Sequence, residues 1–180
     1  FTLVFLMNEL IKIERYNEAK KCIDRGIHLI NKTNRLAEAD FFGQCGIVSW
    51  KLDDIKMARK YFKKAATIYD SVFMDATFFQ NNYVNEYREK ASLFFISYAR
   101  FSTSQQKIEK ANDLYARACE LDESNAEPVI QLVKYYKNRY EVHKCVRLCT
   151  EFLRRYPNNE RVALVLTTVE TSNYSSAIKC

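Results

Sequence analysis

The feature that most constrains this chain is a stripe of four core positions that occurs four times with the same spacing. In each stripe a core residue is followed three positions later by a small residue or a cysteine, then four later by a bulkier or softer one, then three later by another core residue. The stripes are Tyr16, Ala19, Ile23 and Gly26; Ile55, Ala58, Phe62 and Ala65; Ile108, Ala111, Tyr115 and Ala118; and Val142, Cys145, Cys149 and Phe152. Steps of three and four keep side chains on one helix face, so each stripe predicts an amphipathic α-helix.

A second set of core positions precedes each stripe at a constant distance. Counting twelve residues back from the second member of each stripe gives Met7, Gly46, Ala99 and Val133. Each unit therefore predicts two helices in fixed register, joined by a short polar turn. Small residues let the two helices approach closely, and the units must stack because one helix pair cannot bury both of its faces.

Composition agrees with a helical repeat. The 180 residues include only 3 Gly and 2 Pro, too few turn formers to punctuate an all-β fold. Hydrophobic residues make up 48% of the chain, enough apolar surface to offset the entropy of ordering. We therefore expect an all-α fold, specifically an α-α superhelix built as a helical-repeat solenoid.

This pattern resembles the tetratricopeptide repeat (TPR) superfamily. The residues that match the family best are Phe42, Cys45, Gly46, Ala58, Phe62 and Ala65. The unit at residues 126–159 has the family's 34-residue length and ends on Pro157, Asn158 and Asn159, where TPR units normally carry Pro-Asn-Asn. The resemblance implies a right-handed array of helix pairs that serves as a scaffold or adaptor for protein–protein interaction, with a concave groove lined by the first helix of each pair.

We expect a single array over residues 1–180, with units at about 1–34, 39–70, 92–125 and 126–159 and a partial unit at 160–171. Ala58 and Ala111 are 53 residues apart instead of 34, so residues 71–91 are expected to be a long helical insertion that extends the next helix backwards to span about 75–101. The chain opens without Met in mid-pattern, which indicates a fragment of a longer chain. The partial unit is expected to expose an apolar face made of Val162, Leu164, Val165, Leu166 and Val169, which further chain or a second copy would cover.

The expected groove lies on the first helices, opposite the core stripe. Its expected partner-binding residues are Asn8, Ile11, Gln44, Ile47, Trp50, Arg100, Lys134 and Lys137, with Ile96 and Ile130 on the same surface. The groove would be apolar at one end and basic at the other, which suits a peptide or helical segment of a partner protein, or a neighbouring subunit of a larger assembly, with acidic residues at one end. Trp50 would be the anchor, because an indole buries a large area. The alternative is that Trp50 packs against the next unit of the array.

One TPR subclass grips the C-terminal carboxylate of chaperones, and the resemblance does not extend to it. Only Asn8 matches that clamp, because Val4, Leu93 and Ser97 stand where the clamp carries cations, and Gln44 stands where it carries Asn. We therefore expect no chaperone-tail binding, since a carboxylate would be desolvated without a fixed cation.

The alternative function is an RNA-binding helical-repeat module. Residues 134–155 hold seven basic residues against two acidic ones, interleaved with Tyr135, Tyr136 and Tyr140. Cations beside aromatic rings suit single-stranded nucleic acid. Neighbouring residues of a helix face different directions, however, so much of this region cannot converge on one strand.

Chemistry-bearing motifs are missing from the sequence. It has no Gly-rich phosphate loop, no catalytic Ser/His/Asp context and no Cys/His set with zinc-ligand spacing, so we expect no enzyme activity, cofactor or metal. The six cysteines are expected to be buried, reduced thiols, which places the protein inside the cell, in the cytoplasm or nucleus. No apolar run is long enough to cross a membrane.

Overall fold

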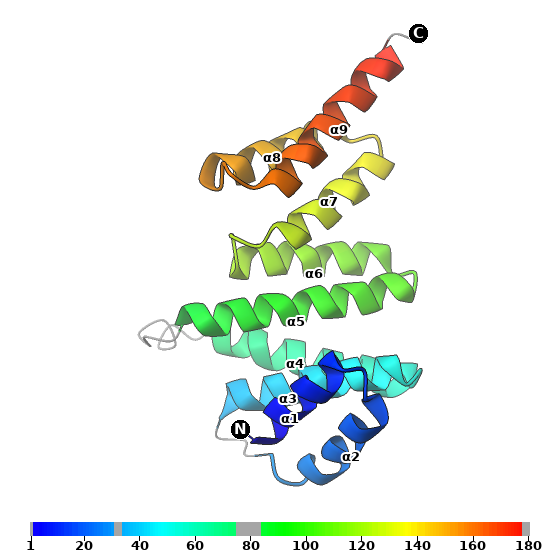
Figure 1. Cartoon of the computed structure of the whole chain (residues 1–180), viewed down its shortest axis with the longest axis vertical. Coiled ribbons are helices and arrows are strands. Elements are labelled where there is room, and N and C mark those ends of the chain that lie inside the picture. Colours follow the sequence, from blue (N-terminus) through cyan, green and yellow to red (C-terminus); the bar gives the residue numbers. More distant parts are fainter. Residues whose placement is uncertain (1, 31–33, 75–83, 178–180) are drawn as a thin grey trace. The chain divides into compact units, whose positions relative to one another are not determined.

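The protein is built from α-helices joined by short turns. A computed structural model describes residues 2–30, 34–74 and 84–177, and these contain no β-strand, which confirms the expected all-α fold (Figure 1). The helices are α1 (Thr2–Lys12), α2 (Tyr16–Gly26), α3 (Arg35–Lys51), α4 (Ile55–Phe73), α5 (Val84–Ser104), α6 (Ile108–Leu121), α7 (Ala126–Asn138), α8 (Val142–Arg155) and α9 (Glu160–Ala177).

The chain divides into two compact units, Phe1–Ser97 and Tyr98–Cys180, here called unit 1 and unit 2. Unit 1 holds α1 to α4 and the first part of α5, and unit 2 holds the rest of α5 and α6 to α9. Residues 71–73 of the expected insertion belong to α4, and α5 begins at Val84. Residues 75–83 of the predicted extended helix lie outside the described residues, and the division into repeat units remains a prediction.

In four hairpins, the turn after the first helix contains a residue with a left-handed backbone conformation. Glu14, Asp53, Gln106 and Tyr140 have φ of 58°, 61°, 57° and 60°, and each lies two residues before the next helix begins. The backbone N–H of Asp54 donates to the carbonyl oxygen of Ser49 at 2.8 Å, and that of Glu141 donates to Tyr136 at 2.9 Å. This bond pattern satisfies carbonyls at a helix C-terminus. The four turns therefore share one geometry although their sequences differ.

Several helices begin with a side-chain cap. The side-chain oxygen of Asn34 accepts the N–H of Ala37 at 3.0 Å at the start of α3, and Asp54 caps α4 through Met57 at the same distance. Asn159, in the predicted Pro-Asn-Asn ending, caps α9 by accepting the N–H of Val162 at 3.1 Å. Such caps are typically worth about 1 kcal/mol each.

The core of unit 1 is aromatic and tightly packed around the small residues that the repeat pattern predicts. A Cβ placed on Gly46 would lie 2.9 Å from the ring of Phe62, so α3 and α4 meet at van der Waals contact. The ring of Tyr69 lies 5.0 Å from that of Phe94, centroid to centroid, which joins α4 to α5. A Cβ on Gly43 would likewise lie 2.9 Å from Phe94. The predicted close approach of α3 and α4 at Gly46 is therefore present.

Where α7, α8 and α9 meet, the core of unit 2 consists mainly of aliphatic side chains and thiols. It contains Ala126, Val129, Ile130, Val133, Cys145, Cys149, Phe152, Val162 and Val169. Because α9 packs against α7 and α8, Val162 and Val169 are buried, Val165 and Leu166 are half-buried, and only Leu164 is strongly exposed, at 69%. The expected exposed apolar face on residues 160–171 is therefore wrong.

We expect Gly46→Leu to destabilise the protein by about 1–3 kcal/mol, because the added side chain would overlap the ring of Phe62. Ala58→Leu, at a fully buried position of α4, should cost a similar amount. Urea denaturation followed by circular dichroism measures both changes. Lys60→Leu, at an exposed position of α4, is the control, and unchanged stability in both core variants would contradict the register.

We expect Tyr140→Gly to stabilise the protein by about 0.5–1 kcal/mol, because Gly adopts positive φ without the strain that a Cβ causes. The Tyr140 side chain is 90% exposed and contributes little packing that could be lost. The measurement is again urea denaturation. Tyr140→Ala keeps the Cβ and should not stabilise, so equal effects of Gly and Ala would contradict the explanation.

Candidate functional site

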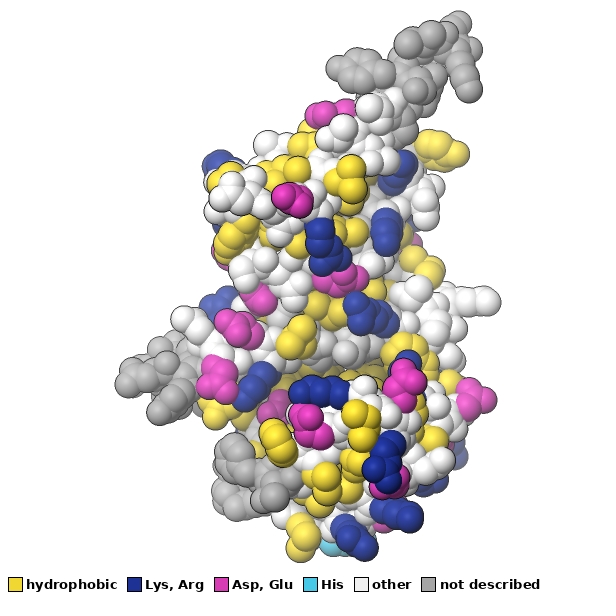
Figure 2. Space-filling model, in the orientation of Figure 1, with side chains coloured by type: hydrophobic (Ala, Val, Ile, Leu, Met, Phe, Trp, Pro, Cys, Tyr) yellow, Lys and Arg dark blue, Asp and Glu magenta, His cyan; other side chains and the backbone are white. Residues whose placement is uncertain are grey.

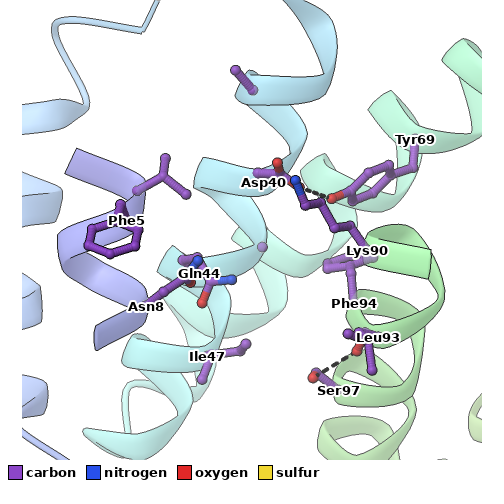
Figure 3. A pocket seen from close by; sticks show the side chains of 13 residues that line it. Phe5, Asn8, Asp40, Gln44, Ile47, Tyr69, Lys90, Leu93, Phe94 and Ser97 are labelled. Atoms are coloured by element: carbon purple, nitrogen blue, oxygen red, sulfur yellow. Dashed lines mark hydrogen bonds between the residues drawn. The ribbon is translucent and has the colours of Figure 1, made fainter. Parts of the chain in front are cut away.

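A cavity of about 430 Å³ lies within unit 1, between its helices. Figure 3 shows Phe5 and Asn8 on α1 and Leu93 and Ser97 on α5, on either side of α3. The lining residues are Val4, Phe5, Asn8, Ala37, Asp40, Gly43, Gln44, Ile47, Tyr69, Lys90, Leu93, Phe94 and Ser97. The α3 residues Asp40, Gln44 and Ile47 are four and three positions apart, so one helix face contributes an acid, an amide and an apolar side chain.

The cavity is apolar for most of its lining and reaches the surface. Phe5 is 67% exposed and Leu93 is 58% exposed, although both are large hydrophobic residues. Figure 2 shows further hydrophobic side chains at the surface around α1 and α2, among charged ones. Exposed apolar side chains beside a cavity are typical of a binding surface.

The polar end of the cavity is formed by a buried hydrogen bond. The hydroxyl of Tyr69, which is only 2% exposed, donates to Oδ1 of Asp40. Burial raises the pKa of Asp40, although the Tyr69 hydrogen bond and the charge of Lys90 act in the opposite direction. Burial and the neighbouring Asp40 raise the pKa of Tyr69 well above its usual value. The Lys90 ammonium also lines the cavity and donates to Glu86 at 2.6 Å.

The structure brings three of the expected groove residues to this cavity: Asn8, Gln44 and Ile47. Ile11 and Trp50 are half-buried and lie outside its lining, and the Lys51 ammonium lies 5.4 Å from the centroid of the Trp50 ring.

The remaining expected groove residues belong to unit 2 or to the core. Arg100 is exposed on α5, and Lys134 and Lys137 are exposed on α7. Ile96 and Ile130 are buried, at 4% and 7% exposed, so their expected place on the groove surface is wrong.

Sequence reasoning missed Asp40, Tyr69 and Lys90. Asp40 could have been predicted from the sequence, because Asp40 precedes Gln44 by one helical turn on the same face. Tyr69 extends the stripe of Ala58, Phe62 and Ala65, which marks it as core but not as a partner for Asp40. Lys90 lies within the expected insertion, where the repeat pattern assigns no role.

Three basic residues of the region at 134–155 pair with glutamates, two of which lie outside it. The hydroxyl of Tyr135 donates to Glu109 at 2.7 Å, and Arg139 pairs with Glu109 at 3.4 Å and with Glu141 at 3.0 Å. Lys144 also pairs with Glu141, and Arg155 pairs with Glu123. These pairs involve three of the seven basic residues that the RNA alternative invokes.

The described residues offer little reactive chemistry. Within this part of the chain, no group of His, Cys, Asp and Glu is placed to hold a metal ion. Cys145 and Cys149 are fully buried, and burial raises the pKa of Cys149 to about 11, so its thiol stays protonated at neutral pH. Among the described helices, none combines the length and hydropathy that crossing a bilayer demands.

Comparison with known proteins identifies the fold. No protein-family model matches the sequence, and no curated protein matches it. The structure is similar to that of the Arabidopsis OM64 TPR domain, with a TM-score of 0.52 over 77% of this chain and 99% of that domain. The chain has a TPR-like fold. Sequence identity to that TPR domain is 10%, so the likeness concerns the fold and not the partner.

We expect Asp40→Asn to stabilise the protein at neutral pH. The raised pKa means that ionising Asp40 costs more in the folded protein than in the unfolded chain, and a neutral amide avoids that cost while still accepting from Tyr69. The advantage should shrink as the pH falls through the folded pKa towards the unfolded value of about 4, where Asp40 is protonated in both states.

Chemical denaturation at several pH values measures this difference. Asp113→Asn is the control, because Asp113 is exposed within α6. An advantage that is missing at neutral pH, or that grows on acidification, would contradict the assignment.

Proposed function

We propose that this protein is a protein-interaction scaffold that holds a peptide or helical segment of a partner protein, and that the cavity of unit 1 receives a bulky apolar side chain of that segment. The observation that carries the proposal is the cavity itself, which is lined by apolar side chains and by two amides from different helices. We expect no catalysis from it, because the sequence carries no recognised catalytic motif.

The size and chemistry of the cavity fit such an anchor. Its volume of about 430 Å³ falls within the range of small-ligand sites, roughly 300–1,000 Å³, and exceeds what one aromatic side chain fills. Phe5, Ile47 and Leu93 supply apolar contacts, and burial of a large side chain among them gives binding free energy in proportion to area. Asn8 and Gln44 carry donors and acceptors suited to the partner's backbone amides.

The same lining argues against a terminal-carboxylate clamp. Of the described residues that line the cavity, Lys90 alone is a cation, and Glu86 accepts from its ammonium. An incoming carboxylate would also meet Asp40, which carries a negative charge when ionised. An apolar anchor needs no free cation and is not repelled by the charge of Asp40.

We expect Phe5→Asp and Leu93→Asp each to weaken peptide binding by about tenfold or more, because both place a charge at an apolar contact. The probe is a labelled peptide selected on the wild-type protein from a random-peptide library, titrated by fluorescence anisotropy. Both positions are exposed, so the variants should keep the fold.

Leu29→Asp is the matched control, because Leu29 is an apolar residue of unit 1 that is 77% exposed and lies outside the cavity lining. Equal loss in the control, or selected peptides that lack a bulky apolar residue, would overturn the proposal. Tight binding of single-stranded RNA that is lost on reversing the charges of Lys134, Lys137 and Arg139 would favour the RNA alternative.

A further inference from the structure

Three helices of unit 2 direct polar side chains at one carboxylate, that of Glu127 on α7. Arg161 of α9 donates to Oε2 of Glu127 at 2.8 Å, and Arg100 of α5 approaches Oε1 at 3.4 Å. Gln131, one turn further along α7, donates its amide to Oε1 at 2.8 Å. These residues lie on the first helices of successive hairpins, where the sequence analysis expected a partner-binding surface.

The charges of this cluster do not balance. Burial raises the pKa of Glu127, but the hydrogen bonds from Gln131, Arg161 and Arg100 and the charge of Arg100 outweigh it, so the net pKa is lowered. Glu127 is therefore ionised at neutral pH, and the two guanidinium groups leave one positive charge in excess. Lys134 adds a further cation on the same face of α7, seven residues after Glu127, and is exposed.

The two arginines keep donors available to a partner. Each guanidinium has five N–H donors in a planar fork. The contacts to Glu127 use one nitrogen of each, and Arg100 also hydrogen-bonds Tyr115. The side chains of Arg100 and Arg161 are 54% and 64% exposed, whereas that of Glu127 is 21% exposed. Solvent therefore reaches the cations more readily than the carboxylate that partly neutralises them.

We propose that Arg100 and Arg161 bind a carboxylate of an acidic segment in a partner protein, and that Glu127 occupies this position when the partner is absent. An incoming Glu or Asp side chain satisfies the same donors in the same way, with bidentate geometry open to it. Displacing Glu127 gives up its contacts to both arginines and to the Gln131 amide, and the incoming carboxylate replaces the contacts to the arginines.

This site is independent of the cavity in unit 1. It rests on the proposed function in one respect: both sites are expected to bind a partner protein. Its residues and variants all lie in unit 2, so the failure of one proposal leaves the other testable.

The test uses the full chain and two short labelled peptides, one of alternating Glu and Ala and one of alternating Gln and Ala. We expect the Glu peptide to bind and the Gln peptide to bind at least about tenfold more weakly. Arg100→Gln and Arg161→Gln should each weaken binding of the Glu peptide by about tenfold, and Arg155→Gln, which alters another exposed arginine of unit 2 that pairs with a glutamate, should leave it unchanged.

The deciding variant is Glu127→Gln. It removes the internal competitor while keeping a side chain of the same shape, so we expect the Glu peptide to bind about fivefold more tightly. A network that serves only to hold the three helices together predicts the reverse, lower thermal stability and no gain in affinity. Glu123→Gln, at the exposed pair with Arg155, is the matched control and should change nothing.

Several outcomes would overturn the proposal. These are equal binding of the two peptides, unchanged or weaker binding by Glu127→Gln in a variant that circular dichroism shows to be folded, and loss of binding in the Arg155 control. Binding of labelled oligouridine in place of the Glu peptide would also overturn it and would assign the arginines to RNA.

Discussion

The contact between Gly46 and the ring of Phe62 determines how the helices of unit 1 are arranged. With no side chain on Gly46, α3 lies at van der Waals distance from α4, and the aromatic rings of α4 and α5 fill the space around it. The face of α3 that carries Asp40, Gln44 and Ile47 is then left to line the cavity. One face of α3 therefore packs closely at Gly46, while another lines the cavity.

The sequence predicts this packing because it is a matter of local spacing. Gly46 and Phe62 have fixed places in the repeat pattern, and steps of three and four along a helix fix the face each residue occupies. The turns are different: Glu14, Asp53 and Tyr140 share a left-handed backbone without sharing a residue type, so composition gives no sign of them. The apolar residues of α9 were expected to be exposed, because the sequence does not show that α7 and α8 pack against them.

The candidate sites show the same division between local and tertiary information. Asn8, Gln44 and Ile47 follow from the faces of α1 and α3, whereas the bond between Asp40 and Tyr69 depends on how α4 packs and has no local pattern. In unit 2, charge counting identifies basic residues but not their partners. Glutamates distant in sequence, such as Glu109 and Glu127, pair with some of these residues, and their positions depend on the packing of separate helices.

The position of the single tryptophan makes the two units separable to spectroscopy. Trp50 belongs to unit 1, and unit 2 contains no tryptophan. Tryptophan emission therefore follows the unfolding of unit 1, whereas far-UV circular dichroism follows the helices of both units. If the units lose their structure at different denaturant concentrations, the two signals give midpoints that do not coincide, and the cooperativity of the whole chain can be read from their separation.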